Sequence, residues 1–352
     1  MALPPPHLAP PPAPKISTKT IPIAGLLVDV HGLDEIPATA TRITCLWLHH
    51  ARTRQKADMA DIAARCVSAW NDTPSKNRGL VALAWDQRNH GSRLVDKQAN
   101  REWKEGNATH AQDMFGIVAG AVADQGILID MVGSYLFHDK PQIQIDRHLA
   151  LGVSLGGHSV WQTMFAEPRV RAGVVIVGCP DFMHLLSTRA KKQGLKTYPK
   201  DGKDAAMAFL GSEDFPASLV EACRKFDPKG ILFGRAPVPK PASSSGWADL
   251  RVYAERNGPH EESQVKERLR GKRFLLCSGG DDDLVPYDIS KPFVEWFKNA
   301  AATSRESLDI SVEDKVYPGV GHWFDREMIK DAVRFTIENV EGSDEGVPTS
   351  KI

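Results

Sequence analysis

The sequence predicts an α/β protein built on a mostly parallel, doubly wound sheet with helices on both faces. Short apolar runs alternate with longer segments of helical periodicity along most of the 352 residues. The apolar runs lack strict alternation, which is typical of strands buried on both faces of a parallel sheet. Hydrophobic residues make up 42% of the chain and charged residues 25%, so a disordered or fibrous chain is excluded.

The predicted elements rest on aliphatic runs for strands and on apolar residues at helical spacing for helices. The strands are expected at 21–30, 42–48, 80–85, 148–153, 172–178, 273–277 and 309–317. The helices are expected at 57–70, 111–137, 157–166, 290–302 and 325–340. The first helix illustrates the pattern, because Met59, Ile62, Cys66 and Trp70 recur on one helical face.

Domain boundaries follow from shifts in composition. Residues 1–16 are proline-rich and are expected to form a disordered tail, since proline removes amide donors and fixes φ. Residues 17–180 and 263–342 are expected to form the core, and 343–352 a flexible C-terminal tail. The stretch 181–262 is rich in Lys, Gly and Pro and is expected to be a cap or lid insertion. Its scattered aromatic residues could roof a substrate pocket or form the core of the cap.

Charge, cysteine usage and hydropathy limit the classes of binding partner and the cellular compartment that we expect. The formal net charge is 0, so the chain lacks the bulk basic surplus that nucleic-acid binding requires. Five widely spaced cysteines without a C-x-x-C pattern predict free thiols, and hence a cytoplasmic protein. The N-terminus has no apolar core of a secretory signal. Asp124 and Asp130 interrupt the most apolar segment, 114–136, so no membrane span is expected. The oligomeric state stays open.

A candidate nucleophile lies between a predicted strand and a predicted helix. Residues 152–156 read Gly-Val-Ser-Leu-Gly, a G-x-S-x-G pattern. A strand–turn–helix with Ser154 at its apex would hold that serine in a strained turn, where flanking glycines avoid steric clashes. The helix N-terminus could then stabilise a developing oxyanion. The alternative is a glycine-rich turn whose serine has no catalytic role.

This block resembles the nucleophile elbow of the α/β-hydrolase family, and the resemblance extends over about residues 20–340. It implies the α/β-hydrolase fold, with the insertion as a cap. Residues 317–324, YPGVGHWF, resemble the family's loop after the last strand, which makes His322 the implied base. The order nucleophile, acid, base along the chain is that of this family.

The implied acid lies in the segment CSGGDDDLVP, residues 277–286. This segment resembles the family pattern G-x-x-D-x-x-V-P, which selects Asp282. Asp281 and Asp283 are neighbouring candidates, and the three carboxylates together could also form a solvated turn or a cation site. Asp181, after the strand that ends near residue 178, is a second position that some members of the fold use for the acid.

Backbone amides of Leu155 and Ala51 are the implied oxyanion-hole donors. The segment CLWLHHART, residues 45–53, follows a strand where the family often has His-Gly, so the amide of Arg52 is an alternative to that of Ala51. The adjacent His49 and His50 are expected to make structural hydrogen bonds.

The segment DQRNHGSR, residues 86–93, resembles a further turn of the family, which is mainly structural. Its Asp86, Arg88 and His90 are therefore expected to have structural roles.

The resemblance implies a serine hydrolase that cleaves a carboxylic ester, lactone or thioester of a small, apolar substrate through an acyl-enzyme. No cofactor and no metal is expected, since no zinc set, P-loop or dinucleotide fingerprint is found. Two alternatives stay open. One is a serine peptidase or amidase on the same fold, and the other is a non-catalytic ligand-binding protein.

Overall fold

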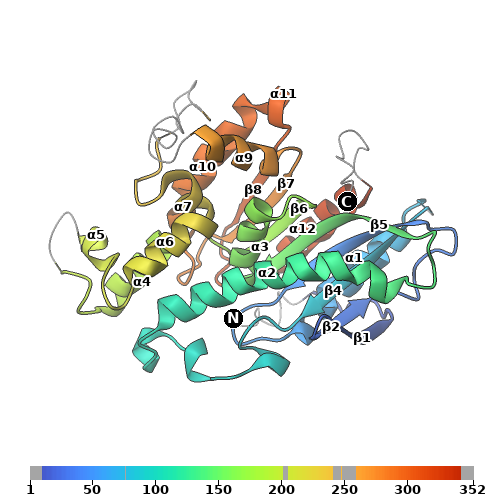
Figure 1. Ribbon diagram of the computed structural model, residues 1–352, viewed down its shortest axis with the longest axis horizontal. Coiled ribbons are helices and arrows are strands. Elements are labelled where there is room, and N and C mark those ends of the chain that lie inside the picture. Colours follow the sequence, from blue (N-terminus) through green and yellow to red (C-terminus); the bar gives the residue numbers. More distant parts are fainter. Residues whose placement is uncertain (1–9, 76, 201–204, 241–246, 248–258, 342–352) are drawn as a thin grey trace.

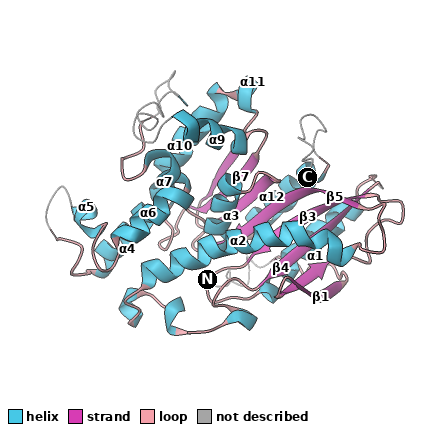
Figure 2. Cartoon of the chain, in the orientation of Figure 1, coloured by secondary structure: helices cyan, strands magenta, loops and turns pink. Residues whose placement is uncertain are grey.

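The computed structural model describes residues 10–75, 77–200, 205–240, 247 and 259–341. The predicted C-terminal tail, part of the predicted N-terminal tail and part of the insertion lie outside the described residues. An eight-stranded sheet forms the centre, and helices cover both of its faces (Figures 1 and 2). The predicted fold class is confirmed.

The strands run in the order β1-β2-β4-β3-β5-β6-β7-β8 across the sheet. Their bounds are β1 Thr18–Ile23, β2 Leu26–His31, β3 Arg42–His49, β4 Arg78–Trp85, β5 Gln144–Val153, β6 Val170–Ile176, β7 Arg273–Gly279 and β8 Ser311–Tyr317. The pairs from β4 to β8 are parallel, whereas β1 and β2 pair antiparallel. All the parallel strands therefore end at the same edge.

The prediction of one strand over residues 21–30 is wrong. The segment is a hairpin, because Ala24 and Gly25 turn the chain with φ values of 49° and 81°. Two consecutive residues at positive φ are typical of the tight turn that joins antiparallel strands. An aliphatic run with one glycine did not reveal this turn.

The helices agree with the predicted ones and add several short elements. The main helices are α1 Ala60–Asn71, α2 His110–Leu136, α3 Leu155–Ala166, α10 Tyr287–Thr303 and α12 Arg326–Val340. The insertion and its surroundings contribute α4 Phe182–Gln193, α5 Ala205–Phe209, α6 Ala217–Phe226, α7 Pro228–Phe233, α9 Pro259–Leu269 and α11 Arg305–Leu308. Single turns of 3-10 helix occur at Lys56–Met59, Gly91–Arg93, Gln98–Asn100 and Trp103–Glu105.

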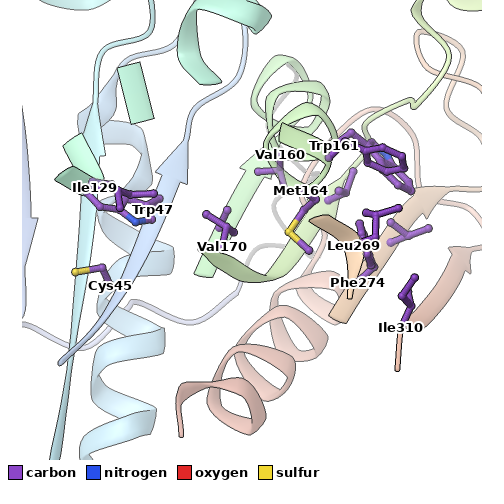
Figure 3. Close-up of a cluster of buried hydrophobic side chains, with 14 of the residues drawn as sticks. Cys45, Trp47, Ile129, Val160, Trp161, Met164, Val170, Leu269, Phe274 and Ile310 are labelled. Atoms are coloured by element: carbon purple, nitrogen blue, oxygen red, sulfur yellow. The ribbon is translucent and has the colours of Figure 1, made fainter. Parts of the chain in front are cut away.

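Two apolar layers fix the helices to the sheet. On one face, α2, α3 and α10 pack through large side chains such as Ile129, Trp161 and Phe293, and part of this layer is shown in Figure 3. On the other face, α1 and α12 pack through side chains such as Trp70 and Phe335. Each fully buried large side chain stabilises the fold by about 1.5–3 kcal/mol.

A third apolar cluster joins the insertion to the core. It brings helices α4 and α6 together with the first half of α2, Leu155 and Val285. Phe182, Phe209 and Phe215 of the insertion pack against one another, with ring centroids 5.6 and 6.2 Å apart for the two pairs that include Phe215. Phe182 also packs against Phe115 of α2, with ring centroids 5.0 Å apart, and Phe209 packs against Trp103 at 6.1 Å, so these aromatic residues join the insertion to the core. That the insertion acts as a cap stays a prediction.

Helix α2 is long and apolar enough to cross a membrane by length and composition alone, although 56% of its most apolar window is buried. Its buried residues Leu128, Ile129 and Val132 belong to the apolar layer on the sheet. A mostly buried core helix can have the same length and hydropathy as a membrane-spanning helix.

Candidate active site

Ser154 occupies a strained turn between β5 and α3. Its φ of 56° and ψ of −111° lie in a region that non-glycine residues rarely adopt. The Ser154 amide donates to the carbonyl of Ile176 on β6, at 2.8 Å, which holds the turn against the neighbouring strand. The strained turn predicted from the glycine pattern is therefore present.

The glycines around Ser154 are required by close backbone contacts. A Cβ on Gly152 would lie 2.1 Å from the carbonyl oxygen of Gly156. A Cβ on Gly156 would lie 2.1 Å from the carbonyl oxygen of His49, at the end of β3. The tight approach of Gly156 to His49 places the start of α3 directly beside the loop that follows β3.

Ser154, His322 and Asp282 form one chain of hydrogen bonds. Ser154 Oγ lies 2.7 Å from His322 Nε2, and His322 Nδ1 lies 2.7 Å from Asp282 Oδ2. An ionised carboxylate accepts only, so Nδ1 carries the ring proton and Nε2 is free to accept from the Ser154 hydroxyl. The three residues follow β5, β7 and β8, and they meet because parallel strands end at one edge of the sheet.

Asp282 is held as an anion inside the protein. Its side chain is fully buried, and its second oxygen, Oδ1, accepts from the amides of Leu284 and Val285 at 2.9 Å each. Burial alone would raise the pKa of this carboxyl group. The hydrogen bonds from His322 and from the two amides outweigh burial, and the pKa lies below its ordinary value.

The neighbouring carboxylates point away from His322. Asp281 is exposed, and the side chain of Asp283 is 99% exposed, with Lys192 3.8 Å away. The loop after β7, which carries Asp282, lies close to the loop after β8, which carries His322. This approach depends on Gly279, since a Cβ there would lie 2.5 Å from the carbonyl oxygen of Val320. Of the three adjacent aspartates, the structure brings only Asp282 to the histidine.

Asp181 lies apart from the Ser154–His322–Asp282 chain. Its carboxylate caps α4 by accepting from the His184 amide at 3.0 Å, and Lys229 Nζ is 4.0 Å away. Asp181 also lines a cavity of about 650 Å³ between the insertion and α10. Ser154, His322 and Asp282 do not line this cavity. The structure gives this residue a helix-capping role.

The amides of Ala51 and Leu155 donate no hydrogen bond to another group in the described part of the chain. Leu155 is the first residue of α3, where the amides of the first turn have no partner within the helix. Ala51 is buried in the loop after β3, next to the contact between Gly156 and His49. The amide of Arg52 likewise has no acceptor among the described residues.

A buried hydrogen-bond network holds the loop of Ala51, and its central residue, Gln87, was missed in the sequence. The Gln87 side-chain amide donates to the carbonyl oxygen of His50, and its oxygen accepts from Ser159 Oγ on α3 at 3.2 Å. The Gln87 backbone amide donates to His50 Nε2 at 3.0 Å. His50 Nδ1 therefore carries the proton and donates to the carbonyl of Ala51 at 2.9 Å. Gln87 occupies a variable position of the DQRNHGSR motif, so the motif gave no signal for it.

Burial keeps the two histidines of this loop neutral. It lowers the pKa of His49 to about 4 and that of His50 to about 4. His49 Nε2 donates to Gln125 Oε1 at 2.8 Å. Their contacts are the structural hydrogen bonds that the sequence analysis expected.

Hydrogen bonds hold the turn after β4 together and join it to α2. Asp86 accepts from the amide and the hydroxyl of Ser92, at 2.8 Å each. Arg88 donates to Asp124 at 3.1 Å, and His90 Nδ1 contacts the carbonyl of Arg88 at 2.9 Å. None of these contacts involves Ser154, which fits a structural role for the turn. Among the described residues, no group of three or more His, Cys, Asp or Glu side chains is arranged to hold a metal ion.

No protein-family model and no curated protein sequence matches the chain. Solved structures do match. Protein TT1662 from Thermus thermophilus is similar at a TM-score of 0.52 and 14% identity, over 94% of this chain and 100% of that chain. The acylaminoacyl peptidase of Pyrococcus horikoshii is similar at a TM-score of 0.52 and 13% identity, over 95% of this chain and 43% of that chain. This chain thus spans less than half of the peptidase's length, and likeness at such identities shows a shared fold.

Proposed function

From the premise that this chain has the α/β-hydrolase fold, we propose that it is a serine hydrolase with Ser154 as nucleophile, His322 as base and Asp282 as acid. The hydrogen-bond chain that links these three side chains, with both distances at 2.7 Å, is the observation that supports this proposal. The nucleophile and base are within hydrogen-bond reach, and a third group orients the base, as covalent catalysis by serine requires.

The proposed reaction is acyl transfer from an ester to water. His322 takes the proton of Ser154 as Oγ attacks the carbonyl carbon, and the carbonyl oxygen becomes an oxyanion facing the amides of Leu155 and Ala51. Asp282 stabilises the imidazolium that forms. The intermediate collapses as His322 gives its proton to the leaving alkoxide, and an acyl-enzyme remains. Water, deprotonated by the same histidine, then releases the acid and restores Ser154.

A carboxylic ester, lactone or thioester of a small molecule is the proposed substrate. A serine peptidase or amidase is the second candidate, supported by the fold that the chain shares with the acylaminoacyl peptidase. A non-catalytic ligand-binding role is the third reading.

A fluorophosphonate probe tests the nucleophile. We expect it to label the wild-type protein at Ser154, to fail with Ser154→Ala, and to label His322→Ala far more slowly, with each variant unfolding at the wild-type temperature. A wild type that is folded but unlabelled would favour the ligand-binding reading. Matched panels of p-nitrophenyl esters, thioesters, lactones and p-nitroanilides then separate an esterase from an amidase.

Three single substitutions test the acid. Asp282→Asn should lower kcat by about 10⁴-fold, because the amide no longer fixes the histidine tautomer or stabilises its cation. Asp281→Asn and Asp283→Asn serve as matched controls and should keep most of the activity, since both carboxylates face solvent. A greater loss in either control than in Asp282→Asn would contradict the assignment.

A further inference from the structure

Gln87 links the two backbone segments that carry the proposed oxyanion donors. It is fully buried at the turn after β4, and in the described part of the chain it makes no hydrogen bond to Ser154 or His322. Its side-chain nitrogen donates to the carbonyl oxygen of His50, in the loop after β3. Its side-chain oxygen accepts from Ser159 on α3, the helix that begins at Leu155.

The bond to His50 fixes the direction of the Ala51 amide. In a trans peptide the C=O of one residue and the N–H of the next are rigidly opposed across one plane. The chain has no cis peptide bond among the described residues, so the His50 carbonyl and the Ala51 N–H point in opposite directions. Since Gln87 holds the carbonyl on one side, the Ala51 N–H is directed to the other side, where it has no acceptor in the described part of the chain.

The backbone amide of Gln87 also helps to fix the next peptide, which joins Ala51 to Arg52. The Gln87 amide donates to His50 Nε2 at 3.0 Å, which sets the tautomer of the ring. The ring then donates from Nδ1 to the carbonyl of Ala51 at 2.9 Å, and the Arg54 amide donates to that same carbonyl at 3.1 Å. The peptides on both sides of Ala51 are therefore held by buried hydrogen bonds.

The hydrogen bond between Gln87 and Ser159 connects the loop of Ala51 with α3, the helix that follows Ser154. Ser159 Oγ lies 3.2 Å from Gln87 Oε1 and also 3.2 Å from the carbonyl of Leu155, one turn earlier. Ser159 is fully buried, and its single hydroxyl proton is shared between these two acceptors. One glutamine side chain thus connects the loop of Ala51 with the first turn of α3, where the Leu155 amide lies.

We propose that Gln87 is a positioning residue for the oxyanion hole, which orients the Ala51 amide and sets its place relative to the Leu155 amide. This inference rests on the proposed hydrolase function. A preorganised donor stabilises charge that develops in the transition state and does little for the neutral carbonyl of the substrate. Loss of the positioning should therefore lower kcat and leave KM nearly unchanged.

The substitution Gln87→Met removes both side-chain bonds without burying a charge. Methionine is similar in length, and its thioether has no proton to donate to the His50 carbonyl and accepts only weakly from Ser159. We expect kcat for an oxoester to fall by about 10²-fold, the loss that follows removal of one oxyanion donor. Ser159→Ala is the matched control, because it removes only the bond to Ser159. It keeps the bond to His50 and should lose less than about tenfold.

A thionoester, in which sulfur replaces the carbonyl oxygen, gives a readout that a merely structural role would not change. Sulfur accepts hydrogen bonds weakly, so wild type should prefer the oxoester strongly, and Gln87→Met should reduce this preference at least tenfold. The pH dependence of kcat should stay unchanged, because the Ser154–His322–Asp282 chain is untouched.

The outcomes separate the two proposals. If the wild type hydrolyses no ester and takes up no fluorophosphonate, the proposed function fails and the role of Gln87 fails with it. If the wild type is active and Gln87→Met retains kcat within threefold, only the role of Gln87 is overturned. Equal losses on oxoester and thionoester would also overturn it, because they would indicate general damage. The unfolding temperatures of Gln87→Met and Ser159→Ala, measured in parallel, show whether each variant is folded at the assay temperature.

Discussion

Gly156→Ala tests whether the contact between α3 and the end of β3 sets the geometry of the proposed active site. The added Cβ would lie 2.1 Å from the His49 carbonyl oxygen and 2.5 Å from its carbon, whereas real Cβ contacts almost never fall below 3.0 Å. The two backbones must therefore separate by about 0.9 Å, taking this 3.0 Å limit. Both obstructing atoms belong to the backbone, so no side chain can rotate away.

The displacement should disturb the alignment of the oxyanion donors. Gly156 follows the Leu155 amide directly, and His49 lies two residues before Ala51. A shift of about 1 Å between reacting groups can lower the rate by about 10²-fold. Forcing extra atoms into a close-packed site also costs about 1–3 kcal/mol of stability. We expect both effects, measured as kcat on a p-nitrophenyl ester and as the free energy of unfolding in urea.

Gly116→Ala is the matched control for this substitution. A Cβ at Gly116 meets no atom within 4 Å, and the residue is an exposed position inside α2. Alanine in place of glycine inside a helix stabilises by about 0.5–1 kcal/mol, with no effect on kcat expected. A Gly156→Ala variant with kcat within threefold of wild type and unchanged stability would refute the reasoning.

Three further predictions follow from the same structure. Gly279→Ala should lower kcat without abolishing folding, since its Cβ would lie 2.5 Å from the Val320 carbonyl oxygen and displace the loop that carries His322; wild-type kcat would contradict this. Stability should fall steeply in acid, because burial lowers the pKa of His148 to about 4 and that of His158 to about 3. Below pH 6.5 these histidines bind protons in the unfolded chain but stay neutral in the folded chain, so each lowers the free energy of unfolding by about 1.4 kcal/mol per pH unit until its folded pKa is reached. A free energy of unfolding in urea that is independent of pH between 6.5 and 5 would disprove it. The five cysteines are free and buried, so Ellman's reagent should react with none in the native protein and with five in guanidinium chloride; fast reaction of a native thiol would count against the packing.

Much of the fold could be predicted because it depends on local patterns. The aliphatic run of β5 and the glycines around Ser154 identify a strand, a tight turn and a helix start within a dozen residues. The hairpin of β1 and β2 was missed, because two aliphatic runs joined by a single glycine are compatible with one continuous strand as well as with two strands and a tight turn. In that case the partner strand, and not the local composition, decided the conformation.

The site was predictable in its residue types and less so in its geometry. Asp281, Asp282 and Asp283 are equivalent by composition, and motif spacing alone preferred the middle one. The turn after β7 buries Asp282 and exposes its two neighbours, so the choice depends on the direction in which each side chain leaves the backbone. Gln87 could not be found at all, because hydrogen bonds to residues 37 and 72 positions away leave no pattern in one sequence.

The strand–helix alternation and the glycine-flanked Ser154 could be read from the sequence alone, because each expresses a steric or hydrophobic requirement that is met within a few neighbouring positions. The order of the three candidate catalytic residues along the chain followed from the resemblance to the α/β-hydrolase family. The tertiary structure decided which carboxylate faces His322, which ring nitrogen is protonated, and which way the Ala51 amide points. Those features are distances and directions between strands that are far apart along the chain, and they are set by sheet register and packing, which no short segment encodes.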